Sequence, residues 1–157
     1  MLRWLWLSLL VILFDQVTKQ LVESSLLVFE MVPLLPSLNL TLVYNEGAAF
    51  SFLSDQGGWQ RWFFILIGLV VSLVLVVWVS RLDKGQRLIA IALCLLIGGA
   101  LGNIIDRLLL GHVVDFIDVY YQDWHWPAFN IADSAITVGV VLMLIDAMRQ
   151  ERRQDDL

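Results

Sequence analysis

Two aspartates, Asp115 and Asp133, lie at the edges of two long apolar segments. The first segment ends near Leu110 and the second begins near Ile131. If the segments cross a membrane in opposite directions, the short link between them brings both carboxylates to one side. Two carboxylates a few Å apart cannot both ionise easily, so they share a proton. The ionised one can then activate water while the protonated one polarises a carbonyl, which predicts an aspartyl dyad for peptide hydrolysis.

Other hydrolytic chemistries lack their residues. The chain has no His-Glu-x-x-His zinc motif and no Gly-x-Ser-x-Gly nucleophile motif. We expect His112 and His125 to be interface residues rather than ligands, so neither a metal nor a cofactor is predicted. Asp118 follows Asp115 by three residues and would point the other way on an extended segment. Asp146 lies a full membrane span away from Asp133, so it cannot join the pair.

The composition indicates a small integral membrane protein. The 157 residues are 59% hydrophobic and 16% charged, whereas soluble domains carry roughly 25% charged residues. Cys94 is the only cysteine, which excludes an intramolecular disulfide. Arg3 and the apolar run Trp4–Phe14 resemble a signal peptide, but no small-x-small cleavage site follows, which favours a retained helix. No basic cluster interleaved with aromatics suggests nucleic acid.

The apolar pattern predicts four transmembrane helices in one domain over residues 1–157. They are expected at about 4–22, 62–80, 88–110 and 130–148, the last spanning only if it reaches Asn130 and Met148. Apolar and polar residues alternate from Leu38 to Asn45, as in a strand with one apolar face. Asn45-Glu46-Gly47 then reads as a turn, and Ala48–Phe52 could return as a second strand. The fold class is therefore all-α and membrane-spanning, with a β-rich platform at about 38–54 between the first two helices.

Basic residues predict the orientation. Seven of the ten Lys and Arg residues fall on the side of the termini (Arg3, Arg81, Lys84, Arg87, Arg149, Arg152 and Arg153). The positive-inside tendency therefore puts both termini in the cytoplasm. The β platform and both aspartates would then lie outside, near the outer leaflet.

Several polar residues could support the dyad. Asp15 and Lys19 form an i,i+4 pair of opposite charge in the first helix, either supporting the outer site or simply ending the span. Asn103, Asp106 and Arg107 share one face of the third helix, where buried polar groups need partners. Simple anchoring at the interface is the alternative for these three.

The remaining motifs concern helix packing and capping. Gly98 and Gly102 form a G-x-x-x-G, which lets helix backbones approach closely. Asn130 precedes Asp133 by three residues and could cap the fourth helix. Asp133 would also be favoured there by the positive end of the helix dipole.

These motifs, in this order, resemble those of the bacterial lipoprotein signal peptidases (signal peptidase II). The resembling stretches are 15–19, 45–50, 98–107, 113–117 and 129–133, which together cover nearly the whole chain. The resemblance implies a multi-pass inner-membrane aspartic endopeptidase that cuts diacylglyceryl-modified prolipoproteins just before the lipidated cysteine. It also implies that Asp115 and Asp133 are the dyad, that membrane lipid surrounds a monomer, and that globomycin-type peptides inhibit it. Residues implied to line or brace the site are Asn45, Gly47, Asn103, Arg107, Asn130 and Ala132.

Two other functions are open from the sequence. A transporter subunit would use its acids to bind a proton or cation, but it needs a polar path across the membrane. The middles of the second and third helices offer only Ser72 and Cys94. An intramembrane protease of the presenilin kind would carry a Gly-x-Gly-Asp motif, which this chain lacks.

Overall fold

The computed structural model describes residues 1–47 and 58–155, with side chains up to residue 151. After a short 3-10 turn, η1 (Leu2–Trp4), four long helices make up most of the chain: α1 (Leu5–Ser25), α2 (Trp59–Arg81), α3 (Arg87–Leu109) and α4 (Ile131–Asp155). All four are long and apolar enough to cross a membrane. The four predicted helices are therefore present, and α4 continues beyond Met148.

The sheet is larger than the sequence predicted. Its strands are β1 (Met31–Leu35), β2 (Leu38–Asn45), β3 (Val113–Tyr121) and β4 (Trp124–His125), in spatial order β1-β2-β3-β4 with antiparallel neighbours. The alternating stretch Leu38–Asn45 is a strand, as predicted. The predicted β-rich segment between the first two helices is confirmed, and β3 and β4, which come from the link before α4, extend its sheet. The possible strand Ala48–Phe52 lies outside the described residues.

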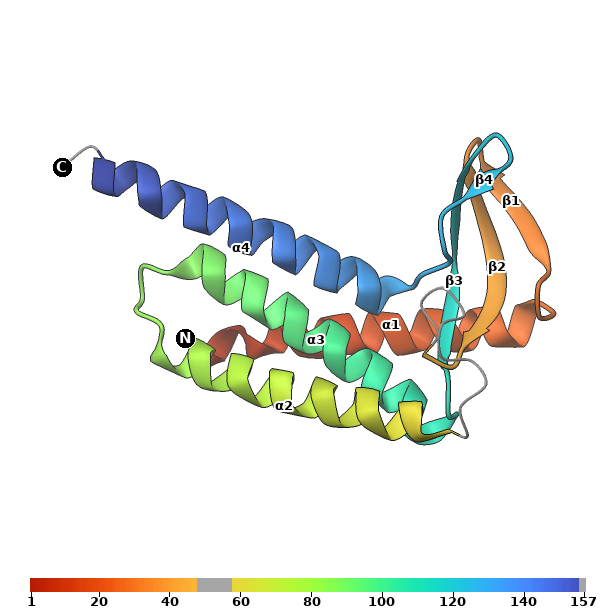
Figure 1. The fold of residues 1–157 in the computed structure, drawn as a ribbon, viewed down its shortest axis with the longest axis horizontal. Helices are drawn as coiled ribbons and strands as arrows, with labels where there is room; N and C mark the ends of the chain where they lie inside the picture. The colour runs from red at the N-terminus through yellow and green to blue at the C-terminus, as the bar shows by residue number, and fades with distance from the viewer. Residues whose placement is uncertain (48–57, 156–157) are drawn as a thin grey trace.

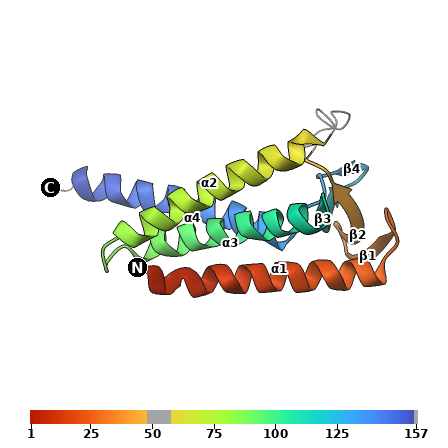
Figure 2. The same ribbon diagram turned by 90° about the horizontal axis from the view of Figure 1, so that it is seen from below.

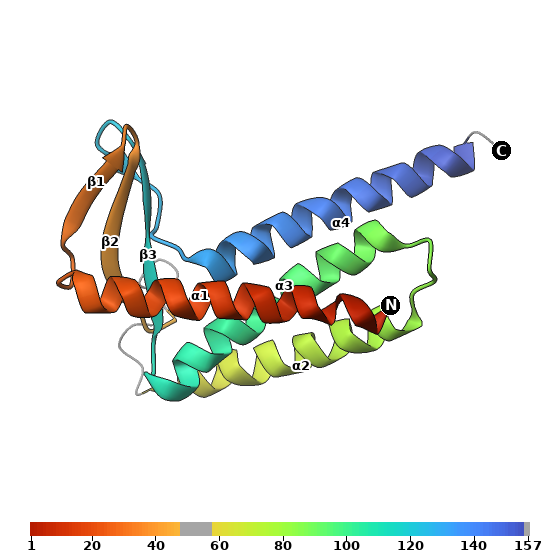
Figure 3. The ribbon, with the colours of Figure 1, turned by 180° about the vertical axis from the view of Figure 1, so that it is seen from behind.

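Helix α3 is the centre of the bundle. In its most apolar window 61% of the residues are buried, against 22% or less in the other three helices, so the others pack around it. Figure 1 shows the sheet standing across one end of the helices, with both termini at the other end. Figures 2 and 3 show the same arrangement from below and from behind.

The glycines of α3 allow this close packing. A Cβ on Gly98 would come within 2.7 Å of the Val11 Cβ in α1, and one on Gly102 within 2.8 Å of an Asp15 carboxylate oxygen. A Cβ on Gly99 would overlap the Ala132 carbonyl oxygen of α4. The predicted packing role of the G-x-x-x-G is therefore confirmed, and it brings α1 and α4 against the polar end of α3.

Candidate active site

Asp115 lies near the start of β3 and is almost completely buried, at 2% exposure. Asn45 donates a side-chain hydrogen bond to Asp115 Oδ2 (2.9 Å), and Asn130 donates one to Asp115 Oδ1 (2.7 Å). Asn45 is placed by the register, because its strand β2 pairs with β3. The β2 strand bulges between Leu40 and Val43, and Val43 is the partner of Asp115.

Asp133 lies in the first turn of α4, where Asn130 caps the helix. The Asp133 backbone N–H donates to Asn130 Oδ1 (2.9 Å), and the Asn130 N–H donates back to Asp133 Oδ2 (3.3 Å). This reciprocal cap confirms the capping role predicted for Asn130. Asn103 of α3 donates its side-chain amide to Asp133 Oδ1 (2.7 Å).

One residue, Asn130, therefore binds both aspartates. It reaches Asp115 through its side chain and Asp133 through its backbone. The chain before it is fixed by Phe129, which exchanges backbone hydrogen bonds with Ile117 of β3 (2.8 and 3.1 Å). The two carboxylates, 18 positions apart, are thus brought to the same place, as the sequence predicted.

Burial raises the pKa of Asp115 from its ordinary value of 3.8 to about 7. The negative charge of Asp133 adds to this rise, while the hydrogen bonds from Asn45 and Asn130 and the charge of Lys19 oppose it. Near neutral pH the Asp115 carboxyl therefore exists in both protonation states. A group poised in this way can give or take a proton at little cost.

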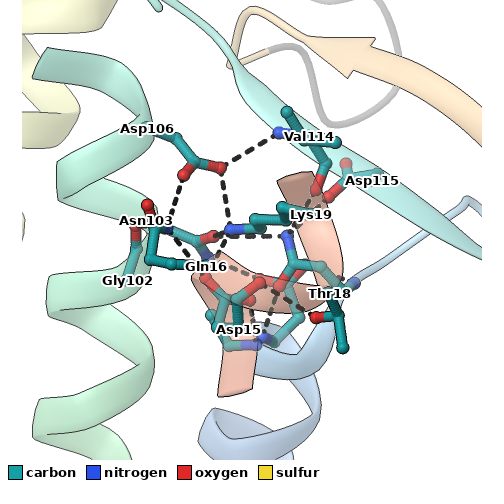
Figure 4. A network of polar contacts seen from close by, with 12 residues as sticks. Asp15, Gln16, Thr18, Lys19, Gly102, Asn103, Asp106, Val114 and Asp115 are labelled. Carbon is teal, nitrogen blue, oxygen red and sulfur yellow. Dashed lines mark hydrogen bonds and ion pairs between the residues drawn. The ribbon is translucent and has the colours of Figure 1, made fainter. Parts of the chain in front are cut away.

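An ion cluster formed by Asp15, Lys19 and Asp106 lies beside the segment that carries Asp115 (Figure 4). Lys19 Nζ contacts Asp15 Oδ2 at 2.7 Å, Asp106 Oδ2 at 2.8 Å and Asn103 Oδ1 at 3.0 Å. The predicted pairing of Asp15 with Lys19 is confirmed. The three ions are at most 2% exposed, so they lie inside the protein rather than at its surface.

Three other predicted residues lie around this centre. Arg107 donates to the Asn103 carbonyl (3.4 Å), and its guanidinium lies 5.0 Å from the centre of the Phe64 ring. Gly47 has φ +107°, and a Cβ there would come within 2.7 Å of Phe64, so a side chain is excluded. Ala132 is fully buried and donates its N–H to Asp15 Oδ1 (2.8 Å).

Asp118, which the sequence ranked below Asp115, and Asp146, which it excluded, make other contacts. Asp118 accepts a hydrogen bond from Asn39 (2.8 Å) and pairs with His125 Nδ1 (2.8 Å). Asp146 accepts a hydrogen bond from Gln150 near the C-terminal end of α4. His112 packs against the ring of Tyr44, with 4.1 Å between ring centres.

Sequence reasoning missed Gln16. Its side-chain amide donates to Asp106 Oδ1 (2.7 Å) and to the Gly102 carbonyl (3.3 Å), joining α1 to α3. Its position beside Asp15 in an apolar helix was the available signal, since a buried amide needs partners. Within residues 1–47 and 58–151, no three His, Cys, Asp or Glu side chains form a group that could hold a metal ion.

Comparison with known proteins places this arrangement in a family. The family model described as signal peptidase (SPase) II matches residues 7–149. A lipoprotein signal peptidase of Pseudomonas paraeruginosa is 54% identical over 153 residues, which cover 96% of this chain and 90% of that protein. One from Acinetobacter baumannii is 54% identical over 151 residues, covering 96% and 86%. A solved structure described as a bacterial membrane enzyme is 35% identical, with a TM-score of 0.84, covering 95% and 89%.

Four apolar helices, a sheet at one end and this likeness define a multi-pass aspartic peptidase of the bacterial inner membrane. The chain belongs to the signal peptidase II family.

Proposed function

We propose that this protein removes signal peptides from diacylglyceryl-modified prolipoproteins, cleaving just before the lipidated cysteine through an Asp115/Asp133 dyad. The names of its relatives, lipoprotein signal peptidases, support the substrate class. The observation that carries the catalytic assignment is the attachment of both carboxylates to the single residue Asn130. Two carboxylates attached to one residue in this way can share a single proton between them.

A pKa of about 7 lets the Asp115 carboxyl carry a proton near neutral pH, and we therefore give Asp115 the role of the acid. Ionised Asp133 takes a proton from water, and the oxygen of that water attacks the scissile carbonyl carbon. The Asp115 carboxyl gives its proton to the carbonyl oxygen, which forms a neutral tetrahedral intermediate. The proton on Asp133 then passes to the amide nitrogen, and Asp115 takes back a proton as the carbon–nitrogen bond breaks. The site thus returns to one proton on two carboxylates.

The remaining assigned residues would position this chemistry. Asn45, Asn103 and Asn130 donate hydrogen bonds to the two carboxylates. Arg107 lies on the same face of α3 as Asn103, with its Nε buried and without a hydrogen-bond partner within the described residues. We assign to it a contact with the substrate backbone.

We further propose that the dyad lies at the outer leaflet, with both termini in the cytoplasm and the protein a monomer. The excess of basic residues at the end away from the sheet supports this orientation. Large apolar side chains around the sheet are exposed, including Phe29 at 73% and Trp124 at 60%. Tryptophan in particular is enriched at the membrane interface. The acyl chains of a substrate could then stay in lipid while its scissile bond reaches the dyad.

The test uses purified protein in vesicles with a precursor peptide prepared with and without the diacylglyceryl group. Mass spectrometry of the products should show one cut, before the modified cysteine, in the lipidated precursor alone. A globomycin-type peptide should block it, and the Asp133→Asn variant should not cleave. Equal cleavage of the unmodified precursor would contradict the substrate, and full activity of Asp133→Asn would contradict the dyad.

A further inference from the structure

We propose that the ion cluster Asp15, Lys19 and Asp106 is a positioning device that sets the separation of the two dyad aspartates. It holds the backbone one residue before each of them. This inference rests on the proposed function, because it concerns the geometry of the same dyad. It assigns to three buried ions a task beyond the general support of the fold.

The two arms of the device have the same design. Asp106 Oδ2 accepts the backbone N–H of Val114, the residue before Asp115, at 3.1 Å. Asp15 Oδ1 accepts the backbone N–H of Ala132, the residue before Asp133, at 2.8 Å. Lys19 Nζ joins the two carboxylates at 2.7 and 2.8 Å. A continuous path therefore connects β3 to α4 through α3 and α1, separate from the link that Asn130 makes.

The cluster is tied further to the dyad and to the bundle. Lys19 also contacts Asn103 Oδ1, and Asn103 donates to Asp133 Oδ1. Gln16 donates to the second oxygen of Asp106 at 2.7 Å, so both oxygens of that carboxylate are bound. Figure 4 shows these side chains converging from α1 and α3 beneath the strand that carries Asp115.

Burial and charge argue for a positional role. The three ions are 0%, 2% and 2% exposed, in the order Asp15, Lys19 and Asp106, so a substrate does not reach them. A buried ion cluster is costly, and apolar side chains of similar size often stabilise a protein as well or better. Its hydrogen bonds are directional, which apolar packing is not, and here they end on the two peptide groups that precede the dyad.

Loosening the device should slow the chemical step more than it weakens substrate binding. A displacement of about 1 Å in a catalytic group can cost on the order of 100-fold in rate. The three side chains are buried and are not expected to contact the substrate themselves, so KM should change little. A purely structural role would instead lower the amount of folded protein and leave the kcat of the folded fraction unchanged.

The experiment compares Asp106→Leu with Asp106→Asn in vesicles, with kcat and KM normalised to folded protein. Leucine keeps the approximate size but has no acceptor for the Val114 N–H, and kcat should fall on the order of 100-fold with KM within about threefold. Asparagine keeps one acceptor oxygen for the Val114 N–H, while its NH₂ group faces Gln16, whose amide can turn to accept it only by giving up the 3.3 Å bond to the Gly102 carbonyl. The kcat of Asp106→Asn should be at least about tenfold higher than that of Asp106→Leu.

Asp118→Leu and Asp118→Asn are the matched controls. Asp118 is 4% exposed and lies on the same strand as Asp115, but its partners are the side chains of Asn39 and His125. Both control variants should lose stability and keep kcat within about threefold, because no backbone group next to the dyad loses its partner.

The proposal is overturned if folded Asp106→Leu keeps the parent kcat, if Asp118→Leu loses as much, or if Asp106→Asn restores nothing. If Asp106→Leu does not fold, Asp15→Asn tests the other arm, with kcat expected about tenfold lower at unchanged KM. If Asp15→Asn has the kcat of the parent, the positioning role is also overturned. Asp133→Asn is measured in parallel: its full activity would remove the proposed function and this inference together. If the Asp133→Asn variant is inactive while Asp106→Leu has the kcat of the parent, only the positioning role is removed.

Discussion

Replacing Asp115 with asparagine should stabilise the folded protein at pH 8 while it abolishes cleavage. Burial first, and then the charge of Asp133, raise the pKa of Asp115 from 3.8 to about 7 in the folded state. Between these two values the folded protein binds more protons than the unfolded chain, so its free energy of unfolding falls as the pH rises. At 1.36 kcal/mol per pKa unit the loss reaches about 4 kcal/mol above pH 7. Neutral asparagine avoids this loss.

The substitution also has a cost. The Asp115 carboxylate accepts hydrogen bonds from Asn45 and Asn130, whereas asparagine has one acceptor oxygen and an NH₂ group that faces a donor. Losing one such bond costs about 1–2 kcal/mol. The expected result is a gain of roughly 2 kcal/mol at pH 8 and a loss of roughly 1–2 kcal/mol below pH 4, where the parent carboxyl is protonated.

The measurement is the free energy of unfolding in detergent micelles from pH 4 to pH 8, for the parent and Asp115→Asn. Asp118→Asn is the control, because the Asp118 carboxylate is also buried and also bound by two side chains, those of Asn39 and His125, but it lies outside the proposed dyad. It should show no gain at high pH. If Asp115→Asn were less stable than the parent by the same margin at pH 4 and pH 8, the account of Asp115 would be refuted.

Three further variants test other parts of the structure. Asn45→Leu removes a hydrogen bond that lowers the pKa of Asp115, so the pH at which cleavage is lost on the alkaline side should move upward in a pH–rate profile. Gly99→Ala should separate α3 from α4 and lower both the melting temperature and activity, while Gly85→Ala, with open space around it, should change neither. Lys19→Met leaves Asp15 and Asp106 buried without their cation, which should reduce the free energy of unfolding by about 3–5 kcal/mol; an unchanged denaturation midpoint would contradict this.

The helices and the aspartate pair could be predicted from the sequence because their signals are local. Long uncharged runs identify spans, and spacings of three and four place Asn103 and Asp106 on one face. The capping role of Asn130 follows from its position three residues before Asp133 in the sequence. The bonds from Asp106 to Val114 and from Asp15 to Ala132 could not be predicted, because they depend on how separate helices pack.

The missed strands have physical reasons. The first four residues of β3, Val113–Phe116, are all buried, Asp115 included, so the sequence shows no alternation of apolar and polar residues that would identify a strand. Strand β1 contains Pro33, which reads as a breaker. Proline is tolerated there because β1 is at the edge of the sheet.

The most direct test of the dyad is a double-mutant cycle on cleavage of the lipidated precursor, with Asp115→Asn, Asp133→Asn and the double variant at equal folded concentration. If the two carboxylates act as one unit, each single variant should lose at least about 10³-fold in kcat, and the double variant should lose no more than either. A single variant within tenfold of the parent, or losses that multiply in the double variant, would show that the two aspartates do not form one catalytic pair.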